Sequence, residues 1–199
     1  MTKEFKSAVQ ARRTFYGISK AVAVSDEKIN EIVTHAVTYV PSAFNSQSAR
    51  VIVLLGAQHD KLWEITKTAL KKIVPSDQFS ATEDKINSFK NGYGSVLYFE
   101  DQTVIEELQS KFALYKDNFP VWSQQSSGML QFAIWTALEI EGLGASLQHY
   151  GALINEEVRK TWNVPDTWQL IAQMPFGKPT VTPDEKQVQP LEQRIKFYK

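Results

Sequence analysis

The sequence predicts an α+β fold of α/β-like character, in which helices lie on both sides of one central sheet. Segments with an apolar residue at every third or fourth position indicate helices with one buried face. Short runs of β-branched and aromatic residues separate these segments and are typical of strands. Because helices and strands alternate along the chain, we expect layers around a single sheet. The 199 residues contain no internal repeat and no linker rich in Pro, Gly or Ser, so residues 1–199 are predicted to form one domain.

The first half of the chain combines clear and unclear signals. Ser25 is a suitable N-cap for a helix that carries a stripe of Ile and Val side chains and ends at Pro41. The apolar run at residues 51–55 predicts a strand that is buried on both faces. A helix is expected over residues 59–74, whereas residues 75–94 show less regular spacing.

The middle of the chain predicts a buried strand and two helices. Residues 95–99 form the apolar run of the strand, and Asp101 is a suitable cap for the helix that follows. Pro120 opens a long helix that reaches about Glu141. From residue 129 to 140 this helix is apolar on nearly every face, which predicts that it is central and buried.

The last part of the chain contains a short helix, with Asn155 as its expected cap, and a third strand over residues 168–174. The tail, residues 184–199, is charged and carries few apolar side chains. Such a segment is too polar to form a core of its own. We expect it to be an arm that lies over a partner subunit.

The composition excludes several classes of function. Lys plus Arg and Asp plus Glu are 22 each, so the formal net charge is zero and no global field recruits nucleic acid or an anionic membrane. The chain has no cysteine and three histidines, which excludes disulfides, thiolate nucleophiles and Cys-type zinc sites and argues against a metal centre. No apolar segment at the N-terminus resembles a secretory signal, so a cytoplasmic protein is expected.

A basic cluster near the N-terminus, Arg12-Arg13-Thr14, suits a phosphate monoester. Its two guanidiniums supply charge and forked donors, and the Thr hydroxyl supplies a directional hydrogen bond. Taken alone, such a cluster is more often a solvated basic turn, because pairs of arginines are common.

The loop at residues 41–47 lies between a predicted helix end and a predicted strand, where ligand crevices often form. Its hydroxyl and amide groups, next to Phe44, suit a planar heterocycle with donors and acceptors on its edge. Ser and Asn also favour an ordinary helix-terminating turn, which is the simpler interpretation of this loop alone.

Two glycine-containing segments are further candidates for a ligand site. After the long helix comes Gly142-Leu143-Gly144-Ala145-Ser146-Leu147-Gln148-His149, where small residues allow a flat ligand to approach the backbone. After the last predicted strand come Gly177 and Lys178, which offer close backbone approach and a point charge. A structural histidine and a strand-ending turn are the simpler interpretations of these two segments.

Together, and in this order, the four motifs resemble those of the flavin-dependent nitroreductase family, within its small bacterial and fungal branch. Members of that family carry Arg-Arg-Ser/Thr, then Pro-Ser-Ala-x-Asn-x-Gln, then Gly-Leu-Gly, then Gly-Lys or Gly-Arg. The resemblance extends from residue 3 to about residue 180. The sequence departs from the pattern at Tyr16, where members often have Arg, and at Ser48-Ala49, where many have Pro-Trp.

The resemblance implies a nitroreductase-type fold, with a central mixed sheet flanked by helices and a C-terminal arm. It further implies a homodimer with FMN at the subunit interface. The phosphate would be held by the basic cluster and Lys178, and the flavin ring or ribityl chain by the 41–47 loop and the segment before Tyr150. The cofactor-binding residues implied in this way are Arg12, Arg13, Thr14, Pro41, Ser42, Ala43, Phe44, Asn45, Gln47, Ser146, Leu147, Gln148, His149, Gly177 and Lys178.

The activity implied by the resemblance is that of an FMN-dependent NAD(P)H oxidoreductase. NADH or NADPH would give hydride to flavin N5, and a nitroaromatic, quinone or similar flat acceptor would then take the electrons in a ping-pong cycle. No side chain is expected to be a catalytic group, and no metal is expected. Two alternatives remain: a non-catalytic protein that binds, stores or senses FMN, and a helical interaction module whose aromatic residues serve only packing.

Overall fold

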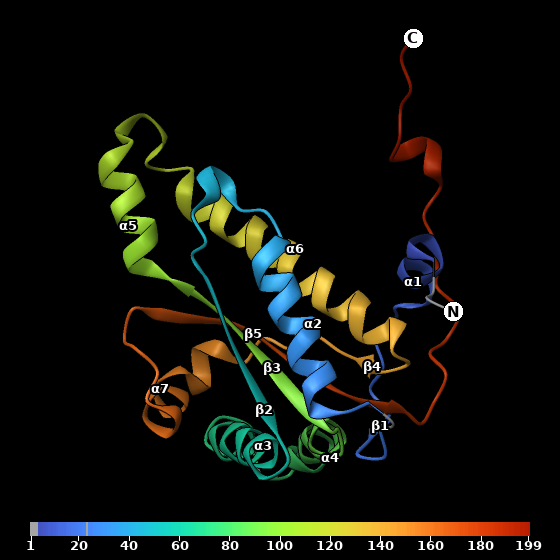
Figure 1. Cartoon of the computed structure of the whole chain (residues 1–199). Coiled ribbons are helices and arrows are strands. Elements are labelled where there is room, and N and C mark those ends of the chain that lie inside the picture. The colour runs from blue at the N-terminus through green and yellow to red at the C-terminus, as the bar shows by residue number, and fades with distance from the viewer. Residues whose placement is uncertain (1–3, 23) are drawn as a thin grey trace.

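The structure, a computed structural model, describes residues 4–22 and 24–199. Within these residues no helix combines the length and the apolar character needed to cross a membrane. The elements, shown in Figure 1, are in chain order α1 (Phe5–Ala11), β1 (Ile18–Ser19), α2 (Asp26–Tyr39), η1 (Ala43–Asn45), β2 (Ala49–Leu55), α3 (Ala57–Leu70), α4 (Phe79–Lys90), β3 (Gly94–Asp101), α5 (Gln102–Lys111), η2 (Ala113–Tyr115), α6 (Phe119–Ile140), β4 (Gly144–Ala145), α7 (Gly151–Trp162), β5 (Trp168–Pro179) and η3 (Leu191–Gln193).

The sheet has the strand order β1-β5-β3-β2, and β4 also pairs with β5. All pairings between these strands are antiparallel, and β5 contacts three of the other four. The parallel component of the predicted mixed sheet is confined to one isolated bridge between Thr14 and Ala145 in the described residues. Strand β5 is therefore the element around which the other strands are arranged.

Helices cover both faces of this sheet, as the alternation of helix and strand signals predicted (Figure 1). On one face, α2 and α6 bury side chains such as Ile29 and Ile134 against Val96 and Met174. On the other face, α3, α4 and α7 bury Trp63, Phe89 and Ile154 against the sheet. Successive strand residues point to opposite faces, so β2, β3 and β5 each contribute side chains to both hydrophobic clusters. The α+β fold class is confirmed.

Local capping chemistry placed two helix starts correctly. The Ser25 hydroxyl accepts a hydrogen bond from the Lys28 N–H at the start of α2, and the Asp101 carboxylate accepts one from Thr103 at the start of α5. The long helix α6 begins at Phe119, directly before Pro120. These starts depend on a few adjacent residues, which is why the sequence predicts them.

Burial of β2 and of the long helix was overestimated. Strand β2 lies at the open edge of the sheet, and of its side chains only Leu54 is fully buried. On α6, Met129 and Phe132 are 43% and 39% exposed. These two apolar side chains therefore point away from the core of this chain. An exposed apolar face of this kind marks a contact surface.

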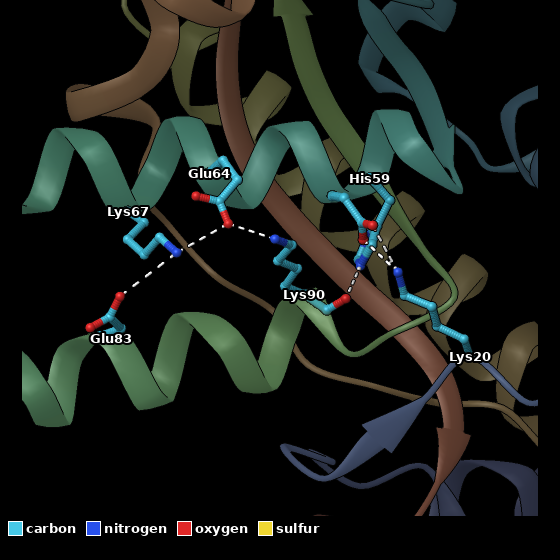
Figure 2. Close-up of polar contacts among 7 residues, drawn as sticks. Lys20, His59, Glu64, Lys67, Glu83 and Lys90 are labelled. Carbon is cyan, nitrogen blue, oxygen red and sulfur yellow. Dashed lines mark hydrogen bonds and ion pairs between the residues drawn. The ribbon is translucent and has the colours of Figure 1, made fainter.

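The region expected to be irregular contains helix α4, which packs on α3. Phe79, Ile86 and Phe89 bury one side of α4. Figure 2 shows the polar contacts between the two helices: Lys90 donates to Glu64 at 2.6 Å, and Lys67 lies 3.7 Å from Glu83. These pairs are partly exposed, so packing of the apolar side contributes more than the charges.

Helix α7 and strand β5 are both longer than predicted. Helix α7 begins at Gly151, and the Asn155 side chain, instead of capping it, accepts a hydrogen bond from the Leu170 N–H of β5. Strand β5 continues to Pro179, so Gly177 and Lys178 lie within the strand and not after it. Beyond Pro179 the described chain forms only η3 and runs away from the sheet (Figure 1).

A fully buried histidine, His59, joins α3, α4 and β3. Trp63 Nε1 donates to the Ser95 hydroxyl at 3.1 Å, so that hydroxyl can donate its own proton to His59 Nδ1, 2.9 Å away. His59 Nε2 then carries the ring proton and donates to the Lys90 carbonyl (Figure 2). This arrangement requires a neutral ring. Burial accordingly lowers the pKa of His59 to about 4.

His59 should make the protein sensitive to acid. An unfolded chain binds a proton at its histidines near pH 6.5, whereas folded His59 resists protonation down to about pH 4, so its contribution to stability is lost as the pH falls through that window. We expect the free energy of unfolding to decrease by up to about 3 kcal/mol more for wild type than for His59→Gln between pH 7 and pH 4. Urea titrations at both pH values measure this difference. His35→Gln, at an exposed histidine, is the matched control, and an identical pH dependence for His59→Gln and wild type would contradict the assignment.

Candidate functional site

Backbone pairing brings three of the four sequence motifs together at one end of the sheet. Thr14 bridges to Ala145, and the Phe15 N–H donates to the Ala145 carbonyl at 3.0 Å. Gly144 pairs with Gly177 across β4 and β5. The N-terminal basic residues, the segment after α6 and the end of β5 are therefore neighbours, although they are far apart in the sequence.

Two adjacent arginines in this region lack a carboxylate partner among the described residues. The Arg12 guanidinium lies over Trp135, 4.4 Å from the ring centroid, and its buried Nε has no hydrogen-bond partner. Arg13 donates to the backbone carbonyl of Asp184 at 2.6 Å. Burial, and then the charge of Arg13, lower the pKa of Arg12. The repulsion between the two cations is uncompensated within the described chain, and an anion placed beside them would relieve it.

Close packing explains the glycine at position 177. A Cβ atom there would lie 2.5 Å from the backbone carbonyl oxygen of Ser19 and 3.0 Å from the Tyr93 nitrogen. Ser19 itself pairs with Lys178, whose side chain is exposed. Gly177 thus lets β1 approach β5, and this approach sets Lys178 at the same end of the sheet as Arg12 and Arg13.

The segment after β4 divides its side chains between the interior and the surface. Ser146 and Gln148 are buried, and the Gln148 amide donates to the Ser146 hydroxyl at 3.1 Å. Leu147 is partly exposed and His149 is exposed. Of the four residues that sequence reasoning grouped as ring-lining, Ser146 and Gln148 therefore bond to each other, and Leu147 and His149 are accessible.

The loop at residues 41–47 is tightly bent and polar. Phe44, Asn45 and Gln47 have φ values of 57°, 50° and 49°, a region that residues with a side chain seldom occupy. The Gln47 N–H donates to the Ser42 hydroxyl at 3.0 Å, which closes the turn. Backbone strain of this kind persists where the surroundings hold it, and it is concentrated at functional sites.

An aromatic cluster and a groove border this loop. The Phe44 ring stacks on Trp122 with a centroid separation of 5.8 Å, and Phe112, Tyr115 and Phe119 surround it. On the other side lies a groove of about 450 Å³ between α2 and the edge strand β2. The polar residues that line the groove include Ser42, Asn45, Gln47, Arg50 and Thr38.

The loop and the basic cluster lie at opposite ends of α2 in one chain. The first turns of α2 contact the end of α6, where Lys28 lies 3.8 Å from Glu141, and Glu141 is close in sequence to β4. The 41–47 loop follows the last turn. Arg12 lies over Trp135 and the loop residue Phe44 stacks on Trp122, and these two tryptophans are 13 residues, or about 20 Å, apart along α6. A single chain therefore does not bring all the predicted site residues together.

Sequence reasoning missed several residues that support the loop. Arg50 Nη1 donates to the Gln47 carbonyl, and Arg50 Nη2 contacts Asp101 at 3.0 Å. Glu100, on β3, is fully buried and accepts a hydrogen bond from Ser48. The one available signal was a glutamate at the end of an apolar strand, and the sequence alone does not show that it is buried. No cluster of three metal-ligating side chains occurs in residues 4–22 and 24–199.

Comparison with known proteins identifies the family. The family model described as "Nitroreductase family" matches residues 9–178. The nitroreductase FRM2 of Saccharomyces cerevisiae is 31% identical over 187 residues, which is 93% of this chain and 93% of that protein. The nitroreductase CinD of Lactococcus lactis, solved with chloramphenicol, is 42% identical with a TM-score of 0.90, covering 98% of this chain and 100% of CinD. Its complex with 4-nitrophenol gives 43% identity, the same TM-score and the same coverage. The chain therefore belongs to the nitroreductase family and has the fold of a nitroreductase-type oxidoreductase.

Proposed function

We propose that this nitroreductase-type protein is an FMN-dependent oxidoreductase that uses NADH or NADPH to reduce flat electron acceptors. The uncompensated pair Arg12 and Arg13 is the observation that carries the proposal. Two guanidiniums without a carboxylate partner in the described chain suit a dianionic phosphate, and Thr14 and Lys178 add a hydroxyl and a third cation at the same end of the sheet. Bound FMN would supply the redox chemistry, taking hydride from NADH or NADPH and passing the electrons to the acceptor.

The polar loop supports a second part of the proposal, that two chains share each flavin. Ser42, Asn45 and Gln47 present hydroxyl and amide groups beside a groove. The loop and the basic cluster of the same chain contact α6 at Trp122 and Trp135, about 20 Å apart along that helix. We propose that the loop of one subunit contacts the ring or ribityl chain of the flavin whose phosphate is held by the other subunit.

Exposed apolar side chains give such a dimer a surface on which to form. Val37 and Tyr39 on α2 and Met129 and Phe132 on α6 are 39–71% exposed. The tail adds Leu191, Ile195 and Phe197, all exposed. Large exposed apolar areas of this kind are typical of protein–protein interfaces. We therefore propose a homodimer in which residues 184–199 cover the partner.

The acceptor is proposed to be a nitroaromatic, a quinone or a similar flat molecule. CinD, 42–43% identical to this chain, has been solved with chloramphenicol, 4-nitrophenol and nicotinic acid. Phe44, half exposed within its aromatic cluster, offers the flat surface on which such rings stack.

The phosphate assignment is tested by comparing FMN with riboflavin, which has the same ring and no phosphate. Arg13→Ala should weaken FMN binding by about ten- to a hundredfold, because each charge-assisted hydrogen bond contributes about 1.5–3 kcal/mol. Its effect on the weaker binding of riboflavin should be small. Flavin fluorescence titrations measure both affinities.

Lys6→Ala is the matched control for Arg13→Ala, because it removes one positive charge from the exposed surface of α1. It should leave both affinities unchanged. Equal losses for FMN and riboflavin in Arg13→Ala would mean that the arginine acts through folding or assembly, and the phosphate assignment would be wrong.

Catalysis is distinguished from storage or sensing by the visible spectrum. Protein purified with excess FMN should retain about one FMN per chain, and anaerobic NADH or NADPH should bleach the flavin absorption band. Addition of 4-nitrophenol or a quinone should then restore it. Retained FMN that neither donor reduces would favour the non-catalytic alternative, and a colourless protein whose melting temperature FMN does not change would refute the cofactor assignment.

If the protein is a homodimer, light scattering should give a mass of twice 22.6 kDa. Deletion of residues 184–199 should shift the equilibrium toward the monomer, because it removes the exposed apolar side chains of the tail. A monomer of wild-type protein with FMN bound would contradict the shared site.

A further inference from the structure

Glu100 is a buried carboxyl group that the proposed chemistry does not use. It lies on β3, is 0% exposed, and pairs in the sheet with Ala49 and Gln169. Its Oε2 accepts a hydrogen bond from the Ser48 hydroxyl at 2.6 Å, whereas its Oε1 has no partner. A buried carboxyl with an unsatisfied oxygen is costly. Its presence calls for a role that an apolar residue could not fulfil.

Ser48 connects this carboxyl to the 41–47 loop. It is the first residue after the loop and is 1% exposed. Its carbonyl accepts the Asp101 N–H at 2.9 Å, so both its backbone and its side chain are bonded to the end of β3. Ser48 also lines a small cavity together with the loop residues Ala43 and Ser46. A change at the Glu100 carboxyl therefore reaches the loop through one residue.

The loop depends on such external support. Phe44, Asn45 and Gln47 all have positive φ values, and the Ser42 hydroxyl is the acceptor that closes the turn. Conformations of this kind persist only when neighbouring contacts hold them. Arg50 holds the Gln47 carbonyl, and Ser48 holds the end of the loop.

We propose that Glu100 is a positioning residue. It sets the conformation of the 41–47 loop through its hydrogen bond with Ser48 and thereby sets the fit of the loop to the flavin ring. The part that concerns the flavin rests on the proposed function. The part that concerns the loop does not.

Glu100 has two charged neighbours. Arg50 comes from β2 and Asp101 follows on β3, whereas its sheet partners, Ala49 of β2 and Gln169 of β5, are uncharged. Burial raises the pKa of Glu100 to about 7, and the Ser48 hydrogen bond and the Arg50 charge oppose that rise. Above pH 7 the ionised carboxylate accepts a stronger, charge-assisted bond from Ser48. The loop should therefore be held more firmly at pH 8 than at pH 6.

Hydrogen exchange of the protein without flavin tests the loop part. At pH 8, amides of residues 42–48 should exchange about three- to tenfold faster in Glu100→Gln than in wild type, because the charge-assisted bond is lost. At pH 6, below the pKa of about 7, wild-type Glu100 is mostly protonated, and the difference between the two proteins should become small. Comparison at equal pH removes the intrinsic pH dependence of exchange. Ser48→Ala breaks the same link from the loop side while Glu100 stays in place, and it should expose the loop at both pH values.

Riboflavin affinity tests the flavin part, and it avoids the ionisation of the FMN phosphate near pH 6. Wild type should bind riboflavin about three- to tenfold more tightly at pH 8 than at pH 6. Glu100→Gln should bind with one affinity at both pH values. Glu64→Gln, the same substitution at a partly exposed glutamate of α3, is the matched control and should keep the wild-type difference.

The outcomes separate the two claims. Unchanged loop exchange in both Glu100→Gln and Ser48→Ala would overturn the proposal. A loop that responds, together with a riboflavin affinity that shows no pH dependence in wild type, would overturn the role toward the flavin. A loop that responds in a protein that binds no flavin would support the coupling of Glu100 to the loop and refute the proposed function instead.

Discussion

The hydrogen-bonded ladder along β5 holds together the segments that form the basic end of the molecule. Phe176 pairs with β3 on one side and with β4 on the other, and the next residues pair with β4 and β1. Gly177 makes this junction possible, because a side chain there would overlap the backbone of β1. Arg12, Arg13 and Lys178 come from distant parts of the sequence. This ladder and the bridge from Thr14 to Ala145 bring them to the same region.

The other end of α2 is built on a different principle. There the 41–47 loop is held in a strained conformation by side chains from β2 and β3. Aromatic rings of Phe112, which follows α5, and of η2 and α6 surround Phe44. One end of the chain thus offers charge that lacks a counterion in the described residues, and the other offers neutral donors and acceptors beside a flat aromatic surface. The two ends are complementary to the two ends of a phosphorylated heterocycle, and a pair of chains can bring them together.

Much of the fold could be predicted because it depends on local chemistry. The caps at Ser25 and Asp101 and the start of α6 at Pro120 are set by adjacent residues. Helix α4 was missed because its buried residues are separated by charged ones and no side-chain cap marks its start. The partial exposure of β2 follows from its place at the sheet edge, which no local pattern encodes.

The candidate site was predictable in its residue types and less so in their arrangement. The residue types predicted positive charge at Arg12 and Arg13 and hydrogen-bonding groups in the 41–47 loop. The stacking of Arg12 on Trp135 could not be predicted, because it depends on how α1 packs against α6. Ser146 and Gln148 turn inward because their strand partner is buried. Glu100 could not be recognised, because the burial of a carboxyl is decided by elements far away in the sequence.

The central claim, that each site combines the basic cluster of one chain with the loop of another, is tested most directly with mixed dimers. Under the proposed function, Arg13→Ala and Asn45→Gly should each weaken both sites of their own homodimer. Asn45→Gly is chosen because glycine tolerates the positive φ at residue 45. In a dimer with one chain of each kind, one site receives both defects and the other receives none. The account predicts that the separately tagged and purified mixed dimer binds one FMN with wild-type affinity. A mixed dimer in which both sites stay weak would show that the loop and the basic cluster of the same chain serve the same flavin, and would contradict the account.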